Sequence, residues 1–288
     1  MAFKLIGKDF TPPDVLAKVT GKAKFSEDIR ADGLVYCRVL GSPMPHARVR
    51  NIDDSEAKKV KGFIAILTAD EVPSFPPPNN SILNNEPRYV GEPILAVAAE
   101  TEAAAAEAVN KIKLDLEPMP FVTDPLESLF PRGPDARTNG NVANVRLKLQ
   151  KIKWSAGDFA KAGDDSLPTG KPAEQWQFGD LEGNFKKADL VVEESFVTAG
   201  YAHNSMEPRS AMAYWQNGKC FLHGSSQSQQ FMIFGLSRLI GIKPTQLVYQ
   251  AAFCGGGFGS KGAPYGEMTV PAHMSKKLGG RPVLMRIS

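Results

Sequence analysis

The chain has 288 residues, 42% of them hydrophobic and 23% charged, with a net charge of +3. This length allows about two domains with substantial cores, and the composition is typical of a soluble globular protein. The small net charge and the scattered Lys and Arg residues argue against nucleic acid as a partner.

The sequence lacks the usual signatures of a membrane protein or of a directly bound metal. No apolar run approaches the roughly 18 residues of a membrane span, and the N-terminal segment resembles no signal peptide. We therefore predict no membrane contact and a cytoplasmic location, or a periplasmic one if a partner carries the export signal. The cysteines, Cys37, Cys220 and Cys254, have no C-x-x-C spacing, so they exclude an iron–sulfur cluster held by this chain alone. We expect Cys254 to be a buried small hydrophobe.

The first 125 residues or so predict a mixed α/β unit. Residues 35–40, 63–67 and 93–99 are apolar runs typical of strands. Thr101 is a candidate N-cap for an alanine-rich helix that ends near Lys111, and residues 113–116 alternate like a half-buried strand. The strand–helix–strand order over residues 93–116 favours a crossover unit with its helix on one face of a sheet.

Regular patterns are scarce from residue 130 to 182, and residues 163–172 are predicted to be a loop or linker. Residues 188–203 predict a long strand. Residues 211–215 and 219–223 then flank Asn217-Gly218, which predicts a hairpin. Residues 226–240 predict a helix that ends at Gly241. Its apolar residues near helical spacing are Phe231, Phe234, Leu236 and Leu239.

The C-terminal segment continues with a turn at Pro244, a strand over residues 246–251 and a helix over residues 266–278 that Pro271 kinks or delays. Between them lies the most informative stretch, CGGGFGSKG at residues 254–262. Its glycines reach positive φ freely, so successive N–H groups can form an anion-binding nest. The P-loop pattern and the dinucleotide fingerprint both fail on spacing. A structural glycine-rich turn is the alternative.

Several separated stretches resemble, in order, the molybdenum hydroxylases of the xanthine dehydrogenase and aldehyde oxidase family. They are VTGKAKFSEDI (residues 19–29), SPMPHARVRNID (42–53), EPRYVGEPILAVAAE (86–100), the exit at 118–125, HNSMEP (203–208), Gln227, CGGGFGSK (254–261) and GRPVLMRIS (280–288). The resemblance implies an α+β fold: an a/b hammerhead domain over residues 1–130, an irregular linker over 131–182, and the beginning of the first molybdopterin-binding domain over 183–288.

The resemblance also implies roles for individual residues. Gln227 matches a glutamine whose amide donates to an oxo ligand of molybdenum, and an amide donor keeps its protonation state. Gly256, Gly257, Phe258 and Gly259 match a loop whose backbone amides contact the cofactor. Gln227 and Phe258 are thus the catalytic candidates in this chain. Without the resemblance, Gln227 would be a surface glutamine at a helix entry, and Phe258 could equally fill the core.

Other positions concern the substrate. Glu207 is a candidate for the substrate pocket, with an ordinary strand-edge carboxylate as the alternative. Gly262 stands where purine-oxidising members place a glutamate, which favours an aldehyde or another heterocycle as substrate. His203 is predicted to be a buried, hydrogen-bonded histidine, and His46 to pack inside the hammerhead domain.

The expected cofactor is molybdopterin in its cytosine dinucleotide form, which holds molybdenum through its dithiolene without direct ligands from this chain. The family resemblance implies oxidation of a small molecule with oxygen from water. It also implies a partner with the C-terminal half of the molybdenum subunit, which carries the base glutamate, and partner subunits with [2Fe-2S] clusters and FAD. The alternative is a non-catalytic scaffold fragment of such a complex.

Overall fold

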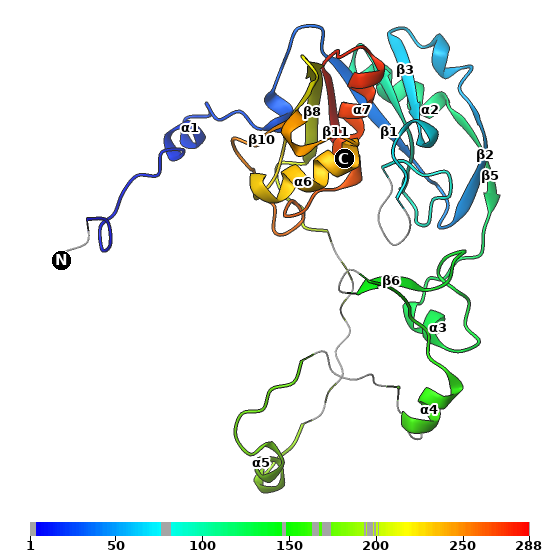
Figure 1. The fold of residues 1–288 in the computed structure, drawn as a ribbon, viewed down its shortest axis with the longest axis vertical. Coiled ribbons are helices and arrows are strands. Elements are labelled where there is room, and N and C mark those ends of the chain that lie inside the picture. Colours follow the sequence, from blue (N-terminus) through cyan, green and yellow to red (C-terminus); the bar gives the residue numbers. More distant parts are fainter. Residues whose placement is uncertain are drawn as a thin grey trace. The chain divides into compact units, whose positions relative to one another are not determined.

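The computed structural model describes residues 4–75, 82–145, 148–162, 167–168, 174–192, 194, 198, 200 and 202–287, without the side chains of 143–149. It separates into two compact units (Figure 1). Unit 1 comprises Met1–Phe121 and His203–Ser288, and unit 2 comprises Val122–Ala202. Because the second segment of unit 1 returns after unit 2, residues far apart in sequence share one core.

A seven-stranded sheet with the order β10-β9-β8-β11-β1-β4-β3 forms the frame of unit 1. Among its strands, β11 pairs in parallel with β1, and β10 with β9, while the other neighbours are antiparallel. β11 lies between β1 and β8, with Val283 opposite Val35 on one side and Ala213 on the other. The strand that ends the described chain therefore joins the N-terminal strands to the later ones (Figure 1). The strands are β1 (Val35–Gly41), β3 (Phe63–Thr68), β4 (Pro93–Ala99), β8 (Arg209–Gln216), β9 (Lys219–Gly224), β10 (Leu247–Gln250) and β11 (Val283–Ile287).

The predicted elements of the N-terminal part are confirmed at nearly the predicted bounds. All seven residues of β4 are buried, as its continuous apolar run requires. Helix α2 (Glu102–Lys111) follows, and the Thr101 side chain accepts a hydrogen bond from the Ala104 N–H as an N-cap. Its buried alanines pack against β4 in one apolar cluster.

The predicted crossover unit is wrong. Strand β5 (Lys113–Pro118) does not join the sheet of β4 but pairs antiparallel with β2 (Ala47–Asp53) in a separate two-stranded sheet. Both edges of β4 are already occupied by β1 and β3, so the chain leaving α2 finds no free edge there. Short elements complete this part: α1 (Val15–Val19), η1 (Ser26–Asp28), η2 (Ala57–Lys59) and η3 (Ala69–Glu71).

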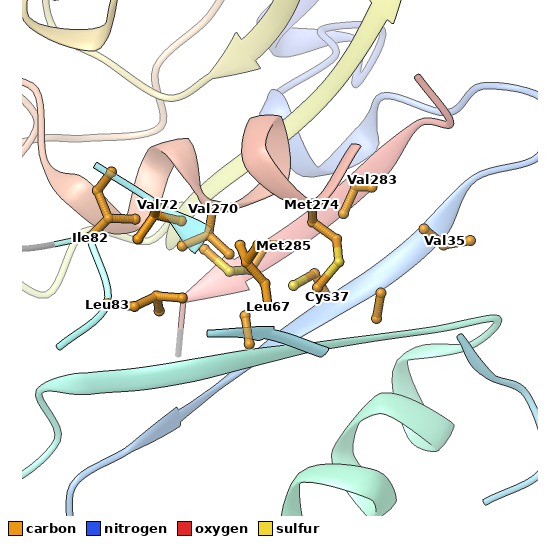
Figure 2. Packing of buried hydrophobic residues seen from close by; sticks show 12 residues of the cluster. Val35, Cys37, Leu67, Val72, Ile82, Leu83, Val270, Met274, Val283 and Met285 are labelled. Carbon is orange, nitrogen blue, oxygen red and sulfur yellow. The ribbon is translucent and has the colours of Figure 1, made fainter. Parts of the chain in front are cut away.

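A second apolar cluster contains residues from both segments of unit 1. Figure 2 shows Val35 and Cys37 of β1 together with Met285 of β11 and Met274 of helix α7 (Val270–Lys277). These side chains are buried, and burial raises the pKa of the Cys37 thiol to about 12, which keeps it protonated. The hydrophobic effect thus holds residues from both ends of the chain in one core.

The hairpin and the two later helices form at nearly the predicted residues, but the predicted apolar face of the first of these helices needs a correction. Asn217 and Gly218 have φ of 50° and 73°, as a primed hairpin turn requires, and Gly241 ends α6 (Gln229–Ile240) at φ 77°. The buried face of α6, however, carries Met232, Leu236 and Ile240. The predicted apolar face is therefore wrong for Phe231 and Phe234, which are 71% and 72% exposed.

The segment between α6 and the end is also as predicted. A short turn η4 (Pro244–Gln246) leads into β10, and η5 (Gly266–Thr269) precedes α7. Pro271 lies in the first turn of α7, where its missing N–H costs nothing, so it delays the helix rather than kinking it.

Unit 2 has a small aromatic core in which Phe130, Trp154 and Phe159 meet with ring centroids 5.2 to 5.8 Å apart. The predicted long strand over 188–203 is wrong in residues 188–192, which form no strand; much of the remainder lies outside the described residues, as does most of the predicted linker at 163–172. Within the part of the chain that is described, no helix is long and apolar enough to cross a membrane. The elements of unit 2 are α3 (Pro125–Leu129), β6 (Val142–Val145), β7 (Lys148–Lys151), α4 (Ala156–Ala162) and α5 (Leu181–Lys187).

Candidate functional site

The glycine loop, residues 254–262, connects β10 to η5 and has a backbone that ordinary residues rarely adopt. Gly256 and Gly259 have φ of 100° and 98°, and Phe258 has φ of 48°. A phenylalanine at positive φ is uncommon, and such backbone strain concentrates at functional sites. The Phe258 ring is 73% exposed, so the alternative that it fills the core is wrong. The loop therefore presents an aromatic ring outward.

Gln227 lies against this loop and is held in one orientation. The Gly259 N–H donates to Gln227 Oε1 at 2.9 Å, and the Gln227 N–H donates to the Lys261 carbonyl at 3.0 Å. Because its oxygen accepts from the loop, its amide NH₂ group remains as a donor. A Cβ on Gly257 would lie 2.5 Å from the Cγ and Oε1 atoms of Gln227, so only glycine permits this close approach.

Successive backbone donors of the loop stay free. Among the described residues, the N–H groups of Gly256, Gly257 and Phe258 have no hydrogen-bond partner, while that of Gly259 is used by Gln227. Gly259 thus serves the loop by orienting Gln227. Three unpaired N–H groups beside an amide NH₂ form a donor surface that suits an anionic group.

These residues fit a molybdopterin cofactor. The oxo, dithiolene and phosphate groups of such a cofactor accept hydrogen bonds, and the exposed Phe258 ring offers a flat apolar surface to an organic ring. In the described part of the chain, no cluster of His, Cys, Asp and Glu could hold a bare metal ion.

Glu207 has a different place from the predicted one. It is 7% exposed, and both carboxylate oxygens are engaged. Oε1 accepts from the Ser26 N–H (3.4 Å) and hydroxyl (3.2 Å), and Oε2 accepts from the Ser225 hydroxyl (2.6 Å) and the Gly255 N–H (2.7 Å). The burial of this carboxylate and its many donors favour a structural role over both the substrate pocket and an exposed strand-edge position.

Lys261 completes the environment of Glu207. Its side chain is 1% exposed, and Nζ donates to Glu207 Oε2 at 3.0 Å and to the Glu207 carbonyl at 2.7 Å. Burial by itself raises the pKa of Glu207, but hydrogen bonds from Ser225, Gly255 and Lys261 outweigh it and leave the pKa below its ordinary value. The Glu207 carboxylate is therefore ionised at neutral pH.

The remaining candidates surround the loop. Gly262 donates its N–H to the Gly259 carbonyl at 3.1 Å, and a Cβ there would lie 4.0 Å from Gln227 Oε1. His203 is exposed, which contradicts the predicted burial, and its Nε2 lies 3.7 Å from the position of a Cβ on Gly259. His46 is buried in the N-terminal part with Nε2 3.3 Å from Glu86, as predicted. Cys254 is only half-buried, so the prediction that it is buried is wrong.

Sequence reasoning missed Lys261, Ser26 and Arg209. Lys261 follows a glycine run and looks like a solvent-exposed residue, and Ser26 lies far from the loop in sequence. Arg209 donates to the Ser260 carbonyl at 3.0 Å and lies 4.7 Å from the centre of the Tyr265 ring. One signal in the sequence could have indicated the ion pair. HNSMEP contains a single acidic residue, Glu207, and CGGGFGSK contains a single basic residue, Lys261.

Comparison with known proteins gives two family matches that together span most of the chain. Residues 20–120 match the a/b hammerhead domain of aldehyde oxidase and xanthine dehydrogenase, and residues 165–288 match the molybdopterin cofactor-binding domain. The chain belongs to the molybdenum hydroxylase family.

Individual relatives agree with this placement of the molybdenum hydroxylase chain. It is 27% identical over 256 residues to a probable xanthine dehydrogenase subunit of Bacillus subtilis, covering 86% of this chain and 31% of that protein. It is 25% identical over 270 residues to the nicotinate dehydrogenase large molybdopterin subunit of Eubacterium barkeri, covering 90% of this chain and 56% of that protein. An aldehyde oxidoreductase structure from Desulfovibrio gigas matches with 26% identity and a TM-score of 0.68, covering 96% of this chain and 29% of that one. The chain thus spans from about a third to about half the length of these relatives.

Proposed function

We propose that this chain forms the first part of the catalytic molybdenum-binding region of a hydroxylase that oxidises a small aldehyde or aromatic heterocycle. The observation that supports this most directly is the orientation of Gln227. Its oxygen is bound by the Gly259 N–H, so its NH₂ group is available as a neutral donor beside three unpaired loop N–H groups. A structural turn would need neither this donor surface nor the positive φ of Phe258.

The proposed roles follow from these contacts. The bound cofactor would supply the oxygen-transfer and two-electron chemistry. The N–H groups of Gly256, Gly257 and Phe258 would bind its anionic atoms, and Gln227 would donate to an oxygen that gains negative charge during the reaction. Donors fixed before the reaction stabilise such charge without reorganisation. The Phe258 ring would limit access of water and orient the flat part of a ligand.

The finer details of cofactor and partners belong to the same proposal. We propose the cytosine dinucleotide form of molybdopterin, together with partner subunits that carry [2Fe-2S] clusters and FAD. We also propose that the catalytic base and the other pterin contacts come from the C-terminal half of the molybdenum subunit, on a separate polypeptide or a longer parent chain. For the domain boundaries we propose the ranges 1–130, 131–182 and 183–288.

Metal and nucleotide analysis of the complex purified with this chain tests the proposal. We expect about one molybdenum per copy of this chain and release of CMP on acid hydrolysis of the cofactor, with mass spectrometry identifying the copurifying subunits. Absence of molybdenum from a complex that contains both halves would overturn the catalytic assignment and favour a scaffold. Molybdenum without CMP would overturn only the dinucleotide form.

The substrate preference rests on Gly262, which lies near Gln227 and offers neither charge nor a side-chain hydrogen bond. A site that recognises ring N–H and C=O groups loses heavily when one polar partner is missing. We therefore expect higher kcat/KM for aldehydes or simple aromatic heterocycles than for xanthine or hypoxanthine, measured with an artificial electron acceptor. A clear preference for xanthine would contradict the inference from Gly262 and leave the cofactor assignment intact.

A further inference from the structure

We infer that Glu207 and Lys261 act as positioning residues for the glycine loop. We call the two side chains, together with the Gly255 N–H between them, the clasp. Glu207 Oε2 accepts from Gly255 N–H at the start of the loop and from Lys261 Nζ at its end. A single carboxylate oxygen thus binds both ends of the segment that presents the free N–H groups. This inference rests on the proposed function only where it concerns the cofactor.

The clasp is built into the interior. Both side chains are buried, and the Glu207 N–H donates to the Gly255 carbonyl at 3.2 Å while Lys261 Nζ also donates to the Glu207 carbonyl at 2.7 Å. The loop ends are therefore tied to Glu207 by both its backbone and its side chain. Ser26, 181 positions away, binds the opposite carboxylate oxygen and fixes the rotamer of Glu207.

The connection from the clasp to Gln227 is direct. The Lys261 carbonyl accepts from the Gln227 N–H, and the Gly259 N–H donates to Gln227 Oε1. Movement of Lys261 would shift the backbone of Gln227 and the loop segment that holds its side chain. Hydrogen bonds to charged groups are stronger than those between neutral groups, and a buried charge without a partner destabilises the fold. The Glu207–Lys261 pair is therefore suited to hold the loop in one conformation before ligand binding.

This arrangement predicts a local effect that is separable from general destabilisation. Loss of the Lys261 ammonium should release the Gly255, Gly259 and Gln227 amides, because each donates to the clasp or to a residue that the clasp positions. Core strands such as β1 and β4 have no contact of this kind. Local opening of a loop then shows as faster amide exchange there without a matching change in the sheet.

Hydrogen–deuterium exchange on the full chain, in the complex as purified and after cofactor removal, is the test. For Lys261→Met we expect about 10- to 100-fold faster exchange in peptides that cover residues 225–229 and 254–262, with β1 and β4 nearly unchanged. Lys111→Met, which removes an exposed helical ion pair with Glu107 at 2.7 Å, is the surface control. Leu236→Ala, in the buried core, is the control for lowered melting temperature without loss of the clasp.

The double variant Glu207→Gln/Lys261→Met separates charge from geometry. It removes both charges, so we expect its melting temperature to exceed that of Lys261→Met because no lone charge stays buried. Its loop should still exchange fast, because a methionine at position 261 cannot donate and the link between the two ends of the loop stays broken. Uniform acceleration across unit 1, an unchanged loop in Lys261→Met, or wild-type loop exchange in the double variant would each overturn the inference.

The molybdenum content of the same preparations extends the test to the cofactor. We expect Lys261→Met to retain at least about 10-fold less molybdenum than the wild type at a temperature well below its melting point, as the loop must be ordered on binding. If the wild-type complex holds no molybdenum, the proposed function fails while the exchange experiment still decides the clasp. Full metal content in Lys261→Met with a loosened loop would overturn the role toward the cofactor.

Discussion

Adding a single methyl group to the glycine loop should displace the Gln227 side chain and so reduce the activity of the site. In Gly257→Ala, the new Cβ would lie 2.5 Å from Cγ and Oε1 and 2.6 Å from Cδ of Gln227. Ordinary carbon contacts are about 3.5 to 4.0 Å, so the glutamine side chain must move by about 1 Å or more. Such a shift breaks the 2.9 Å bond from the Gly259 N–H and turns the NH₂ group away from its position.

The magnitude follows from the two interactions that are lost. The bond between Gly259 and Gln227 contributes about 0.5 to 1.5 kcal/mol to the order of the loop. Loss of one positioned donor at a reacting oxygen costs about 10- to 1000-fold in turnover, which corresponds to about 1.4 to 4 kcal/mol. We therefore expect the turnover of Gly257→Ala to fall by at least about 10-fold. Gly257→Val should also lose bound cofactor, because a β-branched residue obstructs both the backbone and the ligand.

The assay is turnover with an artificial electron acceptor together with molybdenum content and melting temperature of the same sample. Gly157→Ala adds an identical methyl group where the nearest neighbouring atom is 3.7 Å away, and it should behave as the wild type. In Gly257→Ala/Gln227→Ala the clashing atoms are absent, so its metal content should match that of Gln227→Ala alone. Wild-type turnover and full molybdenum content in Gly257→Ala would refute the reasoning.

Two further predictions concern Gln227 itself and the pH dependence of stability. Gln227→Ala should fold with a near-normal melting temperature, because this side chain is exposed, yet lose about 10- to 1000-fold in turnover; an unchanged kcat would place Gln227 away from the reaction. Burial lowers the pKa of His273 to about 4, although the hydrogen bond that its Nε2 donates to the Leu239 carbonyl opposes this shift. Between about pH 4 and 6.5, the unfolded chain therefore binds a proton that the native ring does not. Stability should therefore fall by about 3 kcal/mol as pH drops from about 6.5 to about 4. His273→Gln should show a correspondingly smaller decrease in urea titrations over that range, and an equal decrease would contradict this.

Local sequence was sufficient where a feature depends on neighbouring residues. Thr101 caps α2, Asn217 and Gly218 form the hairpin turn, and Gly241 ends α6, because capping and positive φ are properties of a few adjacent residues. The burial of β4 follows from its continuous apolar run. Family resemblance added the order of the motifs, which predicted that Gln227 and the glycine loop serve the same cofactor.

Tertiary structure decided the features that join distant segments. β11 pairs with both β1 and β8. β5 pairs with β2 because neighbouring strands already occupy both edges of β4, and no local sequence pattern indicates which strand edges are free. Likewise, the glycine-rich sequence around Lys261 does not indicate that its side chain is buried. Its charge is tolerated only because Glu207 lies 54 positions away in sequence and 3.0 Å away in space, where an interior pair is stable if each charge has its partner.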